Sequence, residues 1–333
     1  MGTTMERVRL PAEWYRPSTA WTVAFLAYAL CLFAVPAALS RFAVAHVGPG
    51  WLAALCVVPL TVVAGYGLQL MGFVGHEGLH LSLHRSKRVS AVLGFLYASA
   101  VISYCELGFA AQHWSHHRYT NQASDPDIAP VKHLDTWWKR LLLARVTYNV
   151  IYARTTVCLA LGRPWPFPYR MPFREGEVKW LARANLGFAL GWLAIYGTIT
   201  LIDPLTGLVS IALPMVAALL ISGCQTFLDH AGLGEETYRN AWSRTSWLMS
   251  AVYFGANYHL EHHLYPGVPC YRLHKVHRLL KERGRLVEQR VPHQPSFLRA
   301  YRAVGAPYEP AKRDLEFDPF SRAALSSSAP RRM

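Results

Sequence analysis

The sequence predicts an all-α integral membrane protein with four transmembrane helices, additional interfacial helices and a cytoplasmic helical cap. Of its 333 residues, 52% are hydrophobic and only 16% are charged, whereas about a quarter of the residues in soluble domains are charged. The apolar residues lie in long runs, and about 20 mostly apolar residues in a helix cross a bilayer core. Three histidine clusters lie beyond the ends of these runs.

Four apolar runs are long enough to span a membrane. They cover residues 21–45, 51–74, 181–202 and 208–228. Arg183 and Asn185 lie at the start of the third run, where a long polar side chain reaches the headgroups while its stem stays in the apolar layer. The first two and the last two runs are joined by short turns, which predicts two helical hairpins.

Two further apolar stretches carry charges that make a full crossing costly. Residues 89–111 include Glu106 near their end, and residues 141–161 include Arg145 and Arg154. A charged side chain at the bilayer centre is unfavourable. We therefore expect helices that lie in or dip into the interface, although the first stretch is long enough to span.

The formal net charge of +14 follows the pattern of a membrane protein rather than that of a nucleic-acid binder. Lys and Arg gather before the first run, between the second and third runs, and after the fourth. The turns at residues 46–50 and 203–207 have none. By the positive-inside rule, both termini and the long middle segment face the cytoplasm, at the inner membrane if the protein is bacterial. The six cysteines are scattered without a CxxC pair, which excludes cysteine-held metal clusters.

The chain divides into three parts by composition. Residues 1–19 are predicted to form a cytoplasmic N-terminal segment, and residues 20–291 the membrane-embedded domain. Residues 292–333 are polar and rich in proline and serine, which is typical of a disordered tail.

Three histidine clusters predict a metal centre. Residues three and four apart share one face of a helix, so each cluster presents its imidazoles in one direction. Imidazole binds iron, copper, zinc and nickel, and eight imidazoles exceed what one four-coordinate ion needs. Two metal ions are therefore the natural number. The histidines are His76 and His80; His113, His116 and His117; and His259, His262 and His263.

Two other interpretations of these histidines are open. His76-Glu77-Gly78-Leu79-His80 matches the HExxH motif of zinc proteases, in which the glutamate is the general base. An intramembrane protease, however, would leave the other two clusters unexplained. A metal transporter would place its ligands inside the spans near mid-membrane, whereas these clusters lie just beyond the span ends.

The three clusters and their flanking residues resemble the histidine boxes of the membrane fatty acid desaturase and hydroxylase superfamily, which includes carotenoid ketolases. The second box continues as His116-His117-Arg118-Tyr119-Thr120-Asn121 and is followed by Asp125-Pro126-Asp127. The third reads Asn257-Tyr258-His259-Leu260-Glu261-His262-His263-Leu264-Tyr265-Pro266. The resemblance covers about residues 50–285.

The resemblance implies a non-haem di-iron centre in the helical cap, with two iron ions, O2 as co-substrate and a ninth ligand, His230. It implies oxidation of an unactivated C–H bond in a lipid acyl chain, most simply fatty acid desaturation, with lipid hydroxylation or carotenoid ketolation as the alternative. Family members have an asparagine four residues before the ninth ligand, where this chain has Thr226, next to Gln225.

The resemblance and the absence of a fused haem or ferredoxin motif imply a separate electron donor of the ferredoxin or cytochrome type. Its acidic surface would complement the basic face of this chain. The implied substrate is an apolar lipid chain in a tunnel, whose mouth Trp114, Tyr119, Trp137 and Trp138 line unless they are simple interfacial anchors.

Carboxylates near the boxes are expected to bind the second N–H of ligand imidazoles. The candidates are Glu77, Asp125, Asp127, Asp229 and Glu261. His84 is a spare histidine four residues after His80, and its role as a ligand stays open. The isolated histidines His46, His133, His274, His277 and His293 are expected to be ordinary surface residues.

Overall fold

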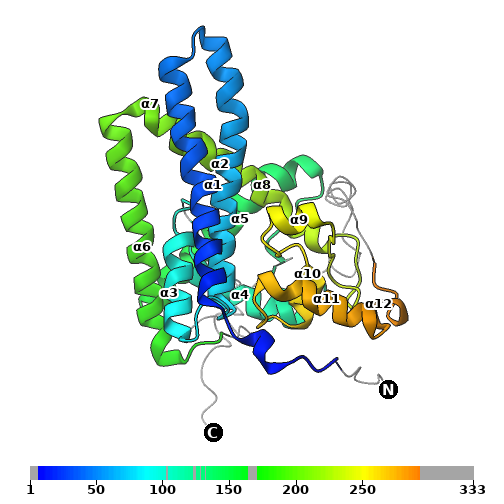
Figure 1. Cartoon of the computed structure of the whole chain (residues 1–333). Coiled ribbons are helices and arrows are strands. Elements are labelled where there is room, and N and C mark those ends of the chain that lie inside the picture. The colour runs from blue at the N-terminus through cyan, green and yellow to red at the C-terminus, as the bar shows by residue number, and fades with distance from the viewer. Residues whose placement is uncertain are drawn as a thin grey trace.

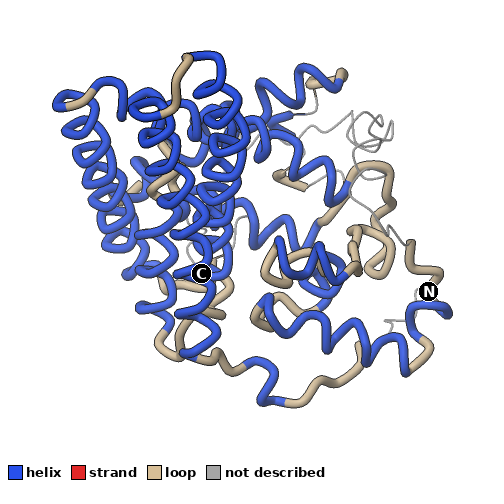
Figure 2. The backbone as a smooth tube through the Cα atoms, turned by 45° about the horizontal axis from the view of Figure 1, so that its top comes forward, coloured by secondary structure: helices blue, strands red, loops and turns tan. Residues whose placement is uncertain are grey.

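The described part of the chain is helical apart from its connecting loops and an isolated β-bridge between Ser243 and Tyr258. The computed structural model describes residues 7–102, 104–122, 125–127, 129–131, 133–163 and 171–292. Figure 2 shows the helices as one bundle of long rods with shorter helices gathered beside one end. The predicted disordered tail lies, from residue 293 onward, outside the described residues.

Four stretches of the described residues are long and apolar enough to cross a membrane, as the sequence predicts. They are Ala12–His46, Gly50–Leu79, Glu175–Ile202 and Pro204–His230. The corresponding long helices are α1 (Thr19–His46), α2 (Gly50–Leu79), α6 (Glu175–Ile202) and α8 (Leu213–His230), and α8 follows α7 (Pro204–Thr206) and the π-helical turn η3 (Gly207–Ala212). The protein is therefore an all-α membrane protein.

Helix α2 is the centre of the bundle because glycines bring its neighbours to backbone distance. A Cβ added at Gly67 would lie 2.3 Å from the backbone nitrogen of Phe33 in α1. One added at Gly65 would lie 2.5 Å from the Cβ of Ala217 in α8. Small residues of this kind let membrane helices approach closely and gain van der Waals contact. Figure 1 shows α1 and α2 as an antiparallel pair that extends beyond the other helices.

The stretch at residues 89–111 is not one helix, contrary to the expectation. It forms α3 (Lys87–Ala98) and α4 (Glu106–Tyr119), joined by a loop. Side chains of α6 satisfy the backbone where the helix breaks: Asn185 accepts a hydrogen bond from the Leu107 N–H (3.0 Å), and Tyr196 donates one to the Ala100 carbonyl (2.9 Å). These partners lie far away in sequence, so the local pattern does not reveal the break.

The polar residues at the start of α6 contact neighbouring helices. Arg183 donates to the carbonyl of Ala160, at the end of α5 (Trp137–Ala160), over 3.1 Å. Asn185 is fully buried and also donates to Ser99. Helix α5 covers the predicted second interfacial stretch and is not among the four membrane-crossing candidates of the described chain.

Short helices and turns follow the fourth span. They are α9 (Trp247–Val252), α10 (His259–Leu264), the turn η4 (Cys270–Arg272), α11 (Leu273–Glu282) and α12 (Arg285–Glu288). The turns η1 (Ala12–Tyr15) and η2 (Ala129–Val131) precede α1 and α5. Helices α10 and α11 lie beside the lower ends of α2 and α4 in Figure 1, so segments far apart in sequence meet there.

The close approach at Gly67 gives a stability test. Gly67→Ala forces α1 and α2 apart, because the new methyl group meets backbone atoms that cannot rotate away. We expect a loss of about 1–3 kcal/mol in unfolding free energy, typical of overpacking, seen as a lower melting temperature in detergent. Gly72→Ala, on the same helix with nothing within 4 Å of the added Cβ, should melt close to the wild type. Equal melting temperatures for the two variants would contradict this account of the packing.

Candidate metal centre

The last turn of α2 presents the first two histidines. His76 lies within the helix and His80 is its C-terminal cap. Both side chains are buried, and their ring centroids lie 4.6 Å apart. Gly78 lets α3 pass directly beneath this turn, because a Cβ there would lie 2.7 Å from the Cα of Gly94. The close packing fixes the direction in which the histidine pair points.

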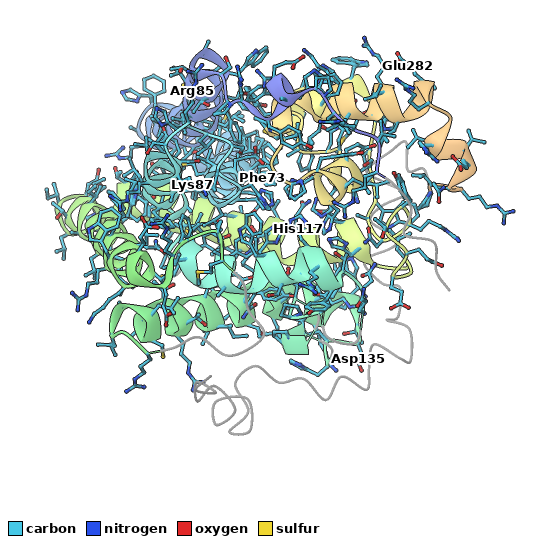
Figure 3. All side chains as sticks on the ribbon, turned by 90° about the horizontal axis from the view of Figure 1, so that it is seen from below. Phe73, Arg85, Lys87, His117, Asp135 and Glu282 are labelled. Carbon is cyan, nitrogen blue, oxygen red and sulfur yellow. The ribbon has the colours of Figure 1, made fainter. Side chains whose placement is uncertain are left out.

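The remaining seven histidines come from three other elements. His113, His116 and His117 share one face of α4, and His230 is the last residue of α8. The short helix α10 carries His259, His262 and His263. The view from below in Figure 3 places His117 near the centre, whereas Arg85 and Glu282 lie toward the edge.

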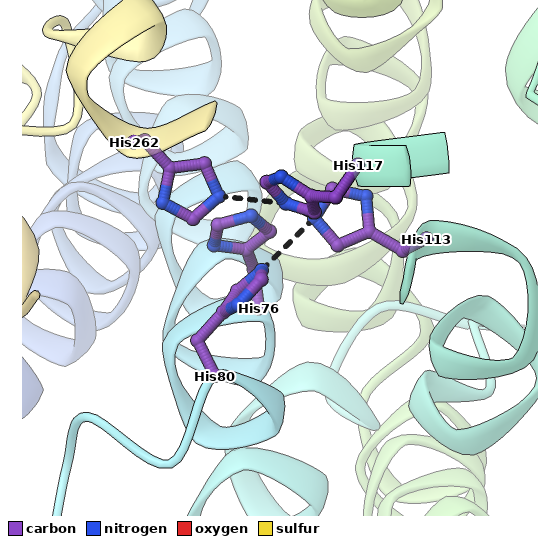
Figure 4. Close-up of side chains that lie close together, drawn as sticks. All are labelled: His76, His80, His113, His117 and His262. Atoms are coloured by element: carbon purple, nitrogen blue, oxygen red, sulfur yellow. Dashed lines mark hydrogen bonds between the residues drawn. The ribbon is translucent and has the colours of Figure 1, made fainter. Parts of the chain in front are cut away.

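The nine rings form two groups. In the first, one ligand-capable atom from each of five residues lies within 4.8 Å of the others; the residues are His76, His80, His113, His117 and His262. Figure 4 shows these five rings turned toward a common space. Nε2 of His113 lies 3.0 Å from Nε2 of both His80 and His117, and Nε2 of His117 lies 3.1 Å from that of His262.

The second group contains His116, His230 and His263, again within 4.8 Å. His259 joins it, because its Nε2 lies 2.9 Å from Nε2 of His230 and 3.1 Å from Nε2 of His263. All nine predicted histidines therefore belong to one of the two groups. Neither group includes a carboxylate among the described residues.

Hydrogen bonds fix the orientation of the rings in the second group. Nδ1 of His116 lies 2.9 and 3.0 Å from the two oxygens of Asp125. Nδ1 of His230 donates to the carbonyl of Asn240 (2.8 Å), and Nδ1 of His263 lies 3.1 Å from Oγ1 of Thr120. A proton on Nδ1 leaves the lone pair of Nε2 free to bind a metal.

The first group has fewer outer partners. In all five of its histidines Nδ1 is buried without a hydrogen-bond partner among the described residues: His76, His80, His113, His117 and His262. Carboxylates lie nearby at longer range: Asp127 is 3.9 Å from Nδ1 of His113, and Glu77 is 3.5 Å from Nδ1 of His76. Buried polar atoms without a partner are rare in folded proteins and call for an explanation.

Burial lowers the pKa of most of these imidazoles well below its ordinary value, and neighbouring histidines lower it further. The affected residues are His80, His113, His117, His259, His262 and His263. His116 is the exception: burial lowers its pKa, but Asp125 and Asp127 raise it more, to about 9. These six imidazoles are therefore held in the neutral form, which coordinates metals.

Only part of the predicted outer shell faces the histidines. Asp125 does so, but Asp229 pairs with Arg244 (2.8 Å) and Glu261 with His277 (2.6 Å). His277 is thus a half-buried hydrogen-bond partner of Glu261 and not a plain surface residue. His84 is exposed, accepts from the Ser86 N–H and belongs to neither group.

The sequence analysis missed Thr120 and the Asn240 carbonyl. Thr120 follows His116 by one helical turn and donates to its carbonyl (2.7 Å). This spacing of four residues from a histidine is the sequence feature that could have identified Thr120. The Asn240 carbonyl belongs to a loop, where no residue pattern identifies a backbone acceptor. Gln225 borders the cavity and bonds to Asp229. The Thr226 side chain lies outside the described part of the structure.

A cavity opens beside both histidine groups. Its wall includes His76, His113, His116, His230 and His259. Its aromatic residues nearest the histidines are Phe73 and Phe109, whose rings stack at 4.5 Å on those of His76 and His113. The predicted mouth residues Trp114, Tyr119, Trp137 and Trp138 are not part of this wall.

Comparison with known families identifies the chain. The family model for fatty acid desaturases matches residues 49–296, a stretch that contains all nine clustered histidines. The chain belongs to the fatty acid desaturase family. The family assignment makes it an oxidoreductase that acts on lipid, and the resemblance seen in the histidine boxes is confirmed.

Individual relatives of this desaturase-family chain are distant. Two fatty acid conjugases of Calendula officinalis are each 21% identical to it, over 267 and 266 residues. These matches cover 71% and 70% of this chain and 70% of each relative. The Delta(5) fatty acid desaturase of Caenorhabditis elegans is 23% identical over 261 residues, which is 68% of this chain and 57% of the relative.

The neutral state of the histidines predicts how the stability of the metal-free protein depends on pH. The folded state resists protonation of these groups, whereas the unfolded chain binds protons below the ordinary pKa of about 6.5. Stability should therefore fall as pH drops below that value, by about 1 kcal/mol between pH 7.5 and 5.5 for each histidine kept neutral. His116 acts in the opposite direction, with stability lost as pH rises through about 9.

Thermal melts of chelator-treated protein at these two pH values would measure the effect. His263→Ala should reduce the pH dependence because it removes one buried neutral group, and His84→Ala should leave it unchanged. A melting temperature that is the same at both pH values would show that the cluster does not exclude protons.

Proposed function

We propose that this protein desaturates a lipid acyl chain at a non-haem di-iron centre held by the nine clustered histidines. The observation that carries the proposal is the convergence of nine imidazoles, seven of them buried and two half-buried, into two adjacent groups beside one cavity. The first ion would be held by His76, His80, His113, His117 and His262. The second would be held by His116, His230, His259 and His263.

The donor atoms fit metal ions. For a metal–nitrogen bond of about 2.1 Å, two ligands at a right angle lie about 3.0 Å apart, and two at the tetrahedral angle about 3.4 Å. The Nε2 contacts of the first group are 3.0, 3.0 and 3.1 Å. The first group offers five imidazoles, one more than a tetrahedral zinc site takes, which supports iron. A bound ion would also give a partner to Nε2 of His76, which is buried without a hydrogen bond among the described residues.

The bound metals would supply O2 activation and removal of hydrogen from an unactivated C–H bond. The chain's own residues position the substrate and exclude water. Phe73 and Phe109 stack on His76 and His113 and give the cavity apolar walls directly beside the histidines. A methylene group bound between these rings would lie next to both histidine groups.

The geometry counts against an HExxH protease. In that mechanism Glu77 would face a metal-bound water as general base. Instead, its Oε2 accepts hydrogen bonds from the Ser82 hydroxyl (2.7 Å) and the Cys270 N–H (3.0 Å). The carboxylate therefore joins α2 to the turn η4, and the histidines of α2 share their space with the other clusters.

A lipid profile tests the proposed reaction. A host that expresses the wild type should gain double bonds in its acyl lipids. A host that expresses His262→Ala should gain none, because this variant lacks one imidazole of the first group. His84→Ala, an exposed histidine outside both groups, is the matched control and should behave as the wild type. New hydroxy or keto lipids would instead establish the hydroxylase or ketolase alternative. An unchanged profile with iron bound and a donor supplied would count against acyl-lipid oxidation.

The metal assignment has a test of its own. Asp125→Asn removes the carboxylate that fixes His116, and a lost outer partner typically costs 10- to 100-fold in metal affinity. We expect the variant to lose the second of the two ions during dialysis. Its iron content, measured by mass spectrometry of the purified protein, should therefore be about half that of the wild type. Asp135→Asn, an exposed partner of Lys139, is the control. Full iron content in Asp125→Asn would remove His116 from the proposed ligand set.

The proposed active site faces the cytoplasm, where a separate ferredoxin or cytochrome would supply electrons. The exposed face of α11 carries Lys275, Arg278 and Lys281, while Leu273, Val276 and Leu280 pack inward. An acidic donor would dock on such a face by charge complementarity. Turnover with a limiting donor should therefore fall as ionic strength rises, because salt screens exposed charges. Turnover that is independent of salt would contradict this docking mode.

A further inference from the structure

Arg145 is a charged residue that the proposed desaturation chemistry does not use. It lies in α5 and forms part of the cavity wall together with His76, His113 and two tyrosines, Tyr104 and Tyr152. A cavity that received only a hydrocarbon chain would have no use for a guanidinium group. The position of Arg145 therefore indicates whether the substrate has a charged group.

The guanidinium has no ionic partner within the described residues. Its Nε is buried and makes no hydrogen bond there, and Arg145 takes part in none of the ion pairs of that part of the chain. Its contact is a cation–π approach to the Tyr104 ring, with 5.4 Å between Cζ and the ring centroid. Arg145 as a whole is half-buried, and a cation without an ionic partner is costly where it is removed from water.

Two arginines that are fully buried show the usual solution. Arg140, on the same helix, donates to the Leu134 carbonyl (2.8 Å). Arg244 pairs with Asp229 (2.8 Å). Arg145 differs from both because it faces the cavity instead of a protein acceptor.

The nearest acids do not neutralise it. Asp127 is directed at the second histidine cluster, with an oxygen 3.7 Å from Nδ1 of His116. Glu106 is fully buried with its carboxylate against Gly75 of α2, and burial raises its pKa well above the ordinary value. A monoanion from outside the chain fits this setting better than a phosphate, whose second charge would be repelled by Asp127.

We infer that the substrate is a free acid, whose carboxylate binds Arg145 inside the cavity while its hydrocarbon chain passes the histidine clusters. The inference rests on the proposed lipid oxidation and names its substrate class. The planar guanidinium offers a fork of N–H donors that matches a carboxylate. From there, Tyr104 and Phe109 form a continuous aromatic wall to His113, with ring separations of 6.2 and 4.5 Å. A thioester or ester carrier would present no charge at this position.

The wild-type protein tests the inference without any substitution. Binding of labelled lauric or palmitic acid to protein in nanodiscs would be compared with binding of the methyl ester and the alkyl phosphate of the same chain. Empty nanodiscs give the partition background. A charge-assisted hydrogen bond predicts about 10- to 100-fold tighter binding of the acid than of the ester. Equal affinities for acid and ester, or tighter binding of the phosphate, would overturn the carboxylate assignment.

Variants locate the carboxylate. Arg145→Gln should bring the affinity for the acid down to that for the ester and leave the affinity for the ester unchanged, which also shows that the variant is folded. Arg145→Lys keeps the charge without the fork and should lie between the two. Arg154→Gln, an exposed arginine nine positions along the same helix, should bind as the wild type. Unchanged preference for the acid in Arg145→Gln would overturn the inference.

These outcomes separate the two proposals. New double bonds in the host lipids together with equal binding of acid and ester would overturn the free-acid inference and leave the desaturase function standing. No lipid change and no binding of any of the three chains would overturn both.

Discussion

Nine imidazole rings turned toward one another in a buried space are an unfavourable arrangement for a polypeptide alone, and the rest of the structure is built to hold it. Six of these rings are kept neutral by burial and by one another, so their Nε2 lone pairs face each other at about hydrogen-bond distance. The rings keep this arrangement because the helices that carry them are packed rigidly against one another. The glycine contacts at positions 65, 67 and 78 fix α2 against α8, α1 and α3, and α2 carries the first histidine pair.

The two groups are held by different means. In the second, Asp125, Thr120 and the Asn240 carbonyl fix three rings through Nδ1. In the first group, packing holds the rings, because all five Nδ1 atoms lack a hydrogen-bond partner among the described residues. A carboxylate on Nδ1 makes an imidazole a stronger donor to a metal. The two proposed metal sites would therefore differ in electron richness, although both are built from imidazole alone.

The local sequence predicted the spans and the histidine sets, because each depends on a periodic pattern within one segment. Helix length and apolar runs predicted the four long helices, and the i, i+3, i+4 spacing predicted which rings share a face. His230 was implied only by family resemblance, since one histidine at a helix end carries no pattern. The break before α4 depends on Asn185 and Tyr196, and the pairing of Glu261 with His277 depends on how α10 meets α11. Such contacts join distant segments, so no local pattern contains them.

The length of α2 accounts for the place of the site relative to the bilayer. Its 30 residues at about 1.5 Å of rise each give a rod of about 45 Å, whereas the hydrocarbon core is about 30 Å thick. If α2 enters the core near its first residue, about ten residues extend beyond it, and His76 and His80 lie in that part. Gln69 and Tyr66 then lie at the inner edge of the core, where they border the same cavity. The cavity thus joins a histidine site outside the core to a region at the depth of lipid chains, as an enzyme that oxidises such chains requires.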